Sequence, residues 1–218
     1  DVPIYGISLR NGLPGVKHAL EIIAKEHDCQ LFISADIGSD TFFTGEETQV
    51  CSPLIDAFSV ICASEMSIPG VYALNGYGGD AEMHIAHLNR NVGECMRRGG
   101  FLGASGLTQK DVLDLQKIFD IIGPDDVEQW PQRAAKGELG VFYCKRLWGV
   151  ERIPAAAVTF FFDPDVVCAM NPAIQACMDT KTLQEAEDAI WSQCGILSET
   201  RLAMDLPYPM PPQVPDQP

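Results

Sequence analysis

The chain has 218 residues, of which 15 are Lys or Arg and 30 are Asp or Glu, so its formal net charge is −15. Nucleic acid backbones and anionic membrane surfaces attract proteins through Lys and Arg, and we therefore expect neither as a partner. The longest strongly apolar run, residues 153–162, is about half as long as a membrane-spanning helix requires. No targeting or lipidation motif is visible, which predicts a cytoplasmic protein.

Short apolar runs alternate along the chain with segments in which apolar residues recur every three or four positions, a pattern typical of α/β proteins. In chain order we expect a helix over 16–23, a strand over 31–35, a helix over 53–62, a strand over 71–75, helices over 85–96 and 109–122, strands over 139–144 and 157–162, and a helix over 183–194. The predicted fold class is a Rossmann-like, doubly wound α/β fold with a mostly parallel sheet and helices on both faces. Residues 1–206 are predicted to form a single domain, and the proline-rich residues 207–218 an extended tail.

Local signals mark the beginnings of three of these helices. Ser52 reads as an N-cap followed by proline at the first helical position, and Thr108 reads as the N-cap of the helix over 109–122. Thr182 and Glu185 form a capping box before the last predicted helix.

The eight cysteines form no C-x-x-C pair and lie mostly within apolar stretches. Buried free thiols have this distribution, whereas disulfide frameworks are usual in short secreted chains. We therefore expect all eight cysteines to be reduced.

An acidic segment extends from Glu26 to Asn89, with ten carboxylates and no Lys or Arg. Carboxylates that crowd together without cations raise one another's pKa or recruit a cation. The alternative is a solvated acidic surface, which suits Glu26, Asp28 and Glu65 best.

Three aspartates of this segment follow apolar strands within glycine-containing turns, where α/β sheets place ligand sites. Asp36 and Asp40 flank Gly38 in a D-x-G-x-D pattern, and Asp80 belongs to the glycine turn after the next strand. We predict that Asp36, Asp40 and Asp80 converge in one crevice, as catalytic residues and as ligands of a divalent cation such as Mg²⁺, Ca²⁺ or Mn²⁺. The alternatives are hydrogen bonds to substrate hydroxyls and a structural role in which the carboxylates accept from turn amides.

The second turn, residues 76–81, matches the G-x-G-x-x-A pattern of a dinucleotide-binding turn between a strand and a helix. Asp80 and Glu82 argue against a pyrophosphate there, because they would place negative charge at the helix N-terminus. We expect a cofactor or polar ligand to contact the turn glycines and two flanking carboxylates, namely Gly38, Gly76, Gly78, Gly79, Glu46 and Asp56.

Two histidines, His84 and His87, lie three residues apart near the start of the helix that follows this turn. Imidazoles at this spacing can supply a general base or metal ligands. The alternative is that they occupy ordinary surface positions beside the core face marked by Ile85 and Leu88.

The order of several motifs resembles the domain of unknown function 1152 (DUF1152) family. The resemblance is carried by ADIGSD at 35–40, GEE at 45–47, SPLID at 52–56, GYGGD at 76–80, GGFLGA at 99–104 and FFFDP at 160–164. It covers about residues 4–200 and implies a Rossmann-like α/β fold, without implying an activity. It also implies a further N-terminal region with a glycine-rich turn, which precedes the part represented by this chain.

The leading functional hypothesis is an enzyme, a hydrolase or group transferase, that acts on a small polar molecule in a carboxylate-lined, metal-binding crevice. Ribosyl-containing molecules are among the candidate substrates. Two alternatives remain open: a noncatalytic binding or assembly protein, and a dinucleotide-dependent oxidoreductase. We also expect the chain to pack against a further segment along the edge of its sheet, in a homo-oligomer or through a companion N-terminal segment.

Overall fold

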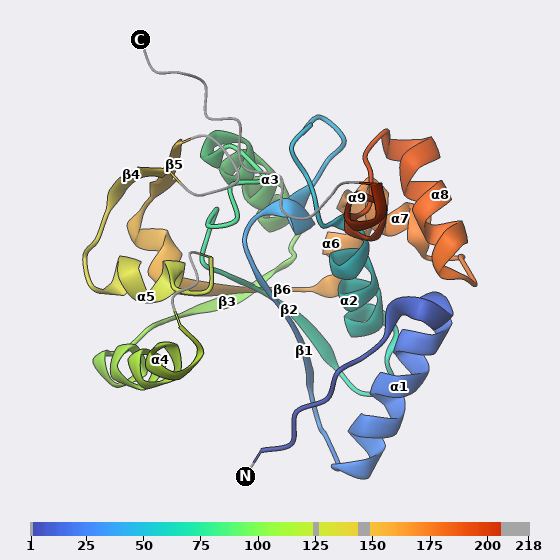
Figure 1. Cartoon of the computed structure of the whole chain (residues 1–218), viewed down its shortest axis with the longest axis horizontal. Helices are drawn as coiled ribbons and strands as arrows, with labels where there is room; N and C mark the ends of the chain where they lie inside the picture. Colours follow the sequence, from blue (N-terminus) through green and yellow to red (C-terminus); the bar gives the residue numbers. More distant parts are fainter. Residues whose placement is uncertain (1, 124–126, 144–148, 206–218) are drawn as a thin grey trace.

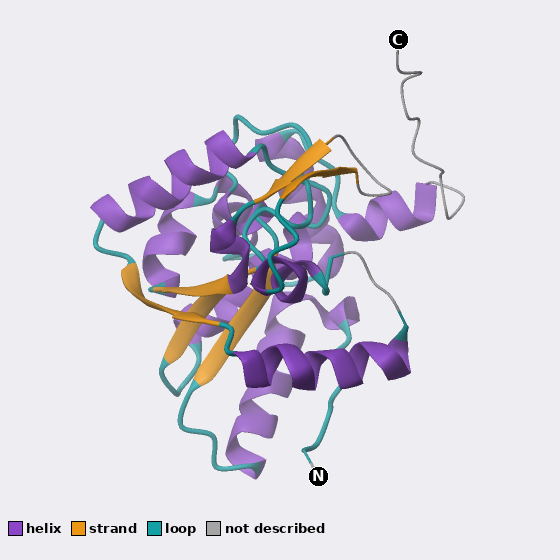
Figure 2. Ribbon diagram, turned by 90° about the vertical axis from the view of Figure 1, so that its left-hand side faces the viewer, coloured by secondary structure: helices purple, strands orange, loops and turns teal. Residues whose placement is uncertain are grey.

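The structure is a computed structural model that describes residues 2–123, 127–143 and 149–205 (Figures 1 and 2). Its strands are β1 (Phe32–Ile37), β2 (Gly70–Asn75), β3 (Phe101–Gly106), β4 (Gly140–Tyr143), β5 (Gly149–Arg152) and β6 (Val158–Phe162). Its α-helices are α1 (Gly12–Glu26), α2 (Pro53–Glu65), α3 (Ile85–Arg97), α4 (Gln109–Ile122), α5 (Trp130–Ala135), α6 (Pro164–Met170), α7 (Pro172–Cys177), α8 (Leu183–Cys194) and α9 (Glu199–Asp205). Three short 3₁₀ helices join them: η1 (Leu9–Asn11), η2 (Asp40–Phe42) and η3 (Pro154–Ala157).

The main sheet has the strand order β1-β2-β6-β3. β1 and β2 are parallel, whereas β6 runs antiparallel to both of its neighbours, β2 and β3. The α/β class is confirmed, but the doubly wound, mostly parallel sheet is not. The reason is that β6 begins beside the end of β3: Val158 pairs with Gly106, and the Leu107 amide donates to the Ala157 carbonyl at 3.0 Å. The chain between these strands returns to the edge of the sheet that it left, so β6 must run backwards.

Helices lie on two sides of the main sheet. In Figure 1, α1, α2 and the C-terminal helices α6 to α9 occupy one side, and α4, α5 and the β4–β5 hairpin occupy the other. α2 packs directly on β1 and β2 and also contacts α6 and α7. The crossover from β1 to β2 therefore covers the sheet where the two parallel strands meet. β3 is covered less well, since Phe101 and Leu102 are exposed.

An aromatic cluster anchors η2 to the sheet. Phe42, Tyr72 and Phe162 are buried, and the Phe42 ring packs edge-on against the other two, with ring centroids 5.9 and 5.0 Å apart. Such edge-to-face pairs add to the stabilisation from apolar burial. This packing holds η2, which carries Asp40, near the carboxyl ends of β1 and β2.

The β4–β5 hairpin is held on α5 by a buried arginine. The Arg152 guanidinium carbon lies 4.0 Å from the ring centroids of Trp130 and of Phe142, and its Nη1 donates to the Glu138 carbonyl at 3.0 Å. A desolvated cation between two aromatic faces is stabilising. The predicted strand over 139–144 is therefore present as β4, although Cys144 lies outside the described residues.

The three predicted helix beginnings agree with the structure, and the side chain of the N-cap residue caps the helix in two of them. Thr108 and Thr182 cap α4 and α8 by accepting from backbone amides three residues later, each at 3.2 Å. Ser52 stands at the N-cap of α2, but its hydroxyl does not cap the helix. The carboxylate of Glu199 instead accepts from the Leu54 amide at 3.1 Å and from a second amide of that first turn.

Seven cysteines lie within the described residues, and no two of them form a disulfide. Cys144 lies outside these residues, as does the predicted tail over 207–218. Of the helices in the described ranges, none combines the length and the apolar character needed to cross a bilayer.

Candidate functional site

The carboxyl ends of β1 and β2 lie side by side because the two strands are parallel neighbours. The Gly38 amide donates to the Asn75 carbonyl at 3.0 Å, and the Gly78 amide donates to the Gly38 carbonyl at 2.9 Å. The turn after β1 is thus joined to the turn after β2. Carboxylates that follow the two strands are brought to one place at this edge of the sheet.

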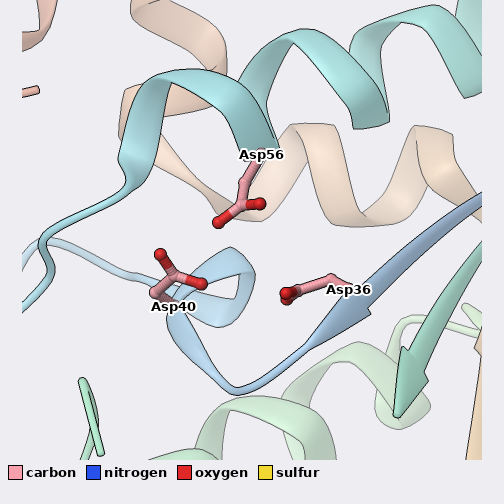
Figure 3. Close-up of side chains that lie close together, drawn as sticks. All are labelled: Asp36, Asp40 and Asp56. Atoms are coloured by element: carbon pink, nitrogen blue, oxygen red, sulfur yellow. The ribbon is translucent and has the colours of Figure 1, made fainter. Parts of the chain in front are cut away.

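Five carboxylates meet there and form the carboxylate cluster: Asp36, Asp40, Asp56, Asp80 and Glu82. Oxygen atoms of Asp36, Asp40 and Asp56 lie within 4.8 Å of one another, and so do oxygen atoms of Asp40, Asp80 and Glu82. Asp40 belongs to both groups and links them. Figure 3 shows the first three side chains pointing toward one another, from the end of β1, from η2 and from the start of α2.

Hydroxyl groups orient two of these aspartates. The phenol of Tyr72, buried on β2, donates to Asp36 Oδ2 at 2.9 Å, and Thr41 Oγ1 donates to the same oxygen at 3.0 Å. Ser52 Oγ donates to Asp40 Oδ2 at 2.9 Å, which explains why this hydroxyl does not cap α2. These neutral donors fix the carboxylates without neutralising their charge.

Backbone amides hold Asp80 and Glu82. Asp80 accepts from the Ser39 amide at 2.9 Å and from the Ser39 hydroxyl at 2.6 Å. A Cβ atom on Gly38 would lie 2.4 Å from Asp80 Oδ2, so glycine leaves the room that this carboxylate occupies. Glu82 accepts from the Cys51 amide at 2.5 Å, which ties the loop before α2 to the turn after β2.

Burial raises the pKa of every carboxyl group in the cluster. The pKa of Asp80 rises to about 8 and that of Glu82 to about 7. The pKa values of Asp40 and Asp56 rise well above their usual range, because repulsion between neighbouring carboxylates adds to the effect of burial. Burial raises the pKa of Asp36 as well. The cluster therefore holds protons at neutral pH that exposed carboxyl groups release.

No Lys or Arg among the described residues forms an ion pair with a member of the carboxylate cluster. Buried carboxylates without such a partner are stabilised by a shared proton or by a cation from solution. Several carboxylate oxygens at this spacing are the donor set that hard divalent cations prefer. The arrangement can thus bind a divalent cation or share protons.

A cavity of about 490 Å³ opens beside the carboxylate cluster, and Glu82 lines it. Its walls come from the loop over residues 46–49, from the turn and first residues of α3, including His84 and His87, and from the β4–β5 hairpin. Ligand sites are usually concave and of this size. A small molecule in the cavity would lie next to the carboxylates.

A family model described as "Protein of unknown function (DUF1152)" matches residues 1–206. The chain belongs to the DUF1152 family. The match confirms the resemblance carried by the ordered motifs of the sequence. No curated protein and no solved structure matches the chain.

In this DUF1152 chain, the three predicted aspartates lie together, and Asp56 lies with them. Glu46 does not join the cluster, because its exposed side chain forms an ion pair with Arg90 at 2.8 Å. Glu82, which the sequence places beside Asp80 in the glycine turn, is a full member of the cluster.

The glycines after β2 serve close packing. Cβ atoms on Gly76 and Gly79 would lie 2.7 Å from an Ile37 methyl carbon and 2.6 Å from the Trp130 ring, so protein side chains fill the space around the turn. α3 does not begin directly after this turn but at Ile85. Asp80 and Glu82 therefore lie in the turn itself, not at the helix N-terminus where their charges were expected. This geometry does not favour a dinucleotide pyrophosphate at the turn.

The two histidines stand at the start of α3. His84 is its N-cap: its Nδ1 accepts from the Ala86 amide at 3.2 Å, so a neutral ring carries its hydrogen on Nε2. The rings of His84 and His87 pack edge-on, with centroids 6.2 Å apart. They line the cavity but do not belong to the carboxylate cluster.

Sequence reasoning missed the donors around the cluster. Tyr72 reads as an ordinary strand residue, and Ser39, Thr41 and Ser52 read as turn or capping residues. Glu199, whose charge raises the pKa of Asp56 further, comes from α9, far along the chain. Only the alternation of side chains along β2 hints at the inward direction of Tyr72.

Proposed function

We propose that this chain is an enzyme that binds a divalent cation in the carboxylate cluster and hydrolyses, or transfers a group from, a small polar molecule. The observation that carries the proposal is the convergence of five carboxylates, of which Asp40 and Glu82 are buried and the other three partly buried, with no ion pair to a Lys or Arg of the described residues. Such a cluster costs stability unless protons or a cation compensate it. A function that uses the cation explains why the cluster is built.

The chemistry follows from the donor set. Asp40 belongs to both groups of three carboxylates and is therefore the central ligand. A divalent cation held by carboxylates polarises a substrate oxygen and lowers the pKa of a bound water. Before a cation binds, burial raises the pKa of Glu82 to about 7, so this group exchanges its proton near neutral pH. Because Glu82 also lines the adjoining cavity, it is the member best placed to meet a substrate there.

Calorimetric titration with Mg²⁺, Mn²⁺ and Ca²⁺ tests the cation site. We expect binding of at least one cation to the wild type, and at least tenfold weaker binding to Asp40→Asn, because the variant removes the charge shared by both groups of ligands. Asp114→Asn, which changes an exposed aspartate on α4, is the matched control and should bind like the wild type. Equal affinities for wild type and Asp40→Asn would contradict the site.

Activity is tested with the same two variants. Ribonucleosides are the first panel, because their hydroxyls and polar groups suit a carboxylate-lined site and they carry no phosphate. We expect cation-dependent turnover that falls about 100-fold or more in Asp40→Asn and is unchanged in Asp114→Asn. Turnover that depends neither on the cation nor on Asp40 would contradict the proposed cation-dependent activity of the carboxylate cluster.

An assembly role is a second candidate, and one observation favours it. Ile118, Ile121 and Ile122 recur on one side of α4, and each is at least half exposed. Contiguous apolar side chains on a surface helix mark interaction sites. We propose that copies of the chain associate through this face of α4.

Size-exclusion chromatography with light-scattering detection measures the molecular mass and so tests this association. We expect a mass above that of one chain, and a shift toward the monomer in Ile118→Lys/Ile121→Lys, because two buried charges at the interface cost several kcal/mol. Asp120→Lys, at an exposed position on the same helix, serves as the control. A monomeric wild type at high concentration would exclude the association.

A further inference from the structure

The cavity beside the carboxylate cluster has a composition that the cluster does not explain. Among the described residues, its lining combines apolar groups with carboxylates and two imidazoles and includes no Lys or Arg; the carboxylates are those of Glu46, Glu47, Glu82 and Glu151. Glu46, Glu47 and Glu82 belong to the acidic segment over residues 26–89, whereas Glu151 comes from β5, far along the chain. The hairpin therefore adds a carboxylate that the acidic segment does not account for.

Part of this negative charge is compensated from outside the lining. Arg90 on α3 lies 2.8 Å from a Glu46 oxygen and 3.6 Å from a Glu47 oxygen. Glu47 is nevertheless ionised, because amide and hydroxyl donors of Thr44 and the amide of Asn91 outweigh burial and lower its pKa. One arginine thus faces two carboxylates, and their sum remains negative.

The hairpin wall adds a carboxylate without a cation. Glu151 on β5 forms no ion pair within the part of the chain that the structure describes, and Val141, its cross-strand partner, lines the same cavity. Glu82 lines the cavity and also belongs to the carboxylate cluster. The cavity therefore combines carboxylates from the loop over residues 46–49, from the turn after β2 and from β5 with apolar side chains.

We propose that this cavity binds an organic cation, a compound with an ammonium or guanidinium group on a short, partly apolar body. This inference rests on the proposed function, since the occupant is the substrate of the neighbouring cluster. Carboxylates bind ammonium and guanidinium groups through charge-assisted hydrogen bonds, and the valines, Met83 and Ile85 provide apolar contact for the carbon chain. A volume of about 490 Å³ exceeds what a bare metal ion needs. An anionic substrate would meet repulsion from every wall.

Binding of 1,5-diaminopentane tests the inference, with 1,5-pentanediol as the neutral analogue of the same length. Titrations are made at pH 8 and with EDTA, so that no divalent cation takes part. We expect the diamine to bind at least tenfold more tightly than the diol. Glu151→Gln should weaken diamine binding about threefold to tenfold and Glu151→Lys more strongly, since one and then two charges are changed. Glu26→Gln, an exposed change at the end of α1, should have no effect.

Equal binding of diamine and diol, or full diamine affinity in Glu151→Lys, would overturn the inference. The Asp40→Asn variant separates it from the proposed function, because that variant removes the cation site and leaves the cavity wall intact. Diamine binding that depends on Glu151, in a protein that binds no divalent cation, supports the cavity and contradicts the cation-dependent function. Cation binding without diamine binding contradicts the cavity alone.

Discussion

Raising the pH from 6 to 8 is expected to lower the free energy of unfolding of the cation-free protein by roughly 2–4 kcal/mol. The cause is the raised pKa of Asp80, about 8, and of Glu82, about 7. In the unfolded chain both groups release their protons below pH 5. Between about pH 5 and pH 8 the folded state therefore holds more protons than the unfolded state. Stability from a raised pKa is fully present below the unfolded value and is lost as the pH rises through the folded value. Urea unfolding at several pH values measures the loss.

Two variants and one ligand check the cause. Asp80→Asn and Glu82→Gln remove the titrating groups and should flatten the dependence on pH in this range. Excess Mn²⁺ or Mg²⁺ should stabilise the wild type more at pH 8 than at pH 6, because metal ligands must be deprotonated. Asp114, whose pKa is lowered to about 2 by Lys110 and Lys117, cannot imitate the effect, since it titrates well below this range. Stability that stays constant or rises from pH 6 to pH 8 would falsify the raised pKa values.

The position of the cluster could be predicted because it depends on one local rule. Two apolar strands joined by a helix are usually parallel, and about two-thirds of consecutive strands are neighbours in the sheet, so that their carboxyl ends meet at one edge. Asp36 and Asp80 follow such strands, and the pairing of β1 with β2 brings them together. The capped beginnings of α4 and α8 were predictable for the same reason, since Thr108 and Thr182 act within one helical turn.

The remainder depends on contacts between distant parts of the chain. The direction of β6 is fixed by the path that the chain takes through the β4–β5 hairpin and η3 before it enters the sheet. The apolar run of β6 does not reveal this direction, because it reads the same either way. β3 was not predicted, since its glycine-rich sequence, FLGASG, resembles a loop. Asp56 lies in the cluster, and Glu199 lies near Asp56, because α9 packs on α2. The spacing of apolar residues alone does not reveal this packing.

Gly38→Ala is expected to lower the free energy of unfolding by about 2–3 kcal/mol and to weaken cation binding. The new Cβ would lie 2.4 Å from Oδ2 and 2.9 Å from Cβ of Asp80, so rotation of the carboxylate alone cannot relieve the contact. Asp80 must move away from the Ser39 amide and hydroxyl, which are its hydrogen-bond donors. Gly106→Ala is the matched control: its Cβ would lie 3.9 Å from the nearest atom, and we expect a change within about 0.5 kcal/mol.

A double-mutant cycle shows whether the cost of Gly38→Ala arises from Asp80. If the clash is the cause, Gly38→Ala should destabilise a protein that already carries Asp80→Ala much less than it destabilises the wild type, with a coupling of about 1–2 kcal/mol. Additive effects would instead locate the cost in the backbone of the turn. Because the Gly38 carbonyl also accepts from the Gly78 amide, backbone strain would disturb both turns and lower stability regardless of the side chain at position 80. The coupling therefore measures how closely the turn after β1 is built around the carboxylate that follows β2.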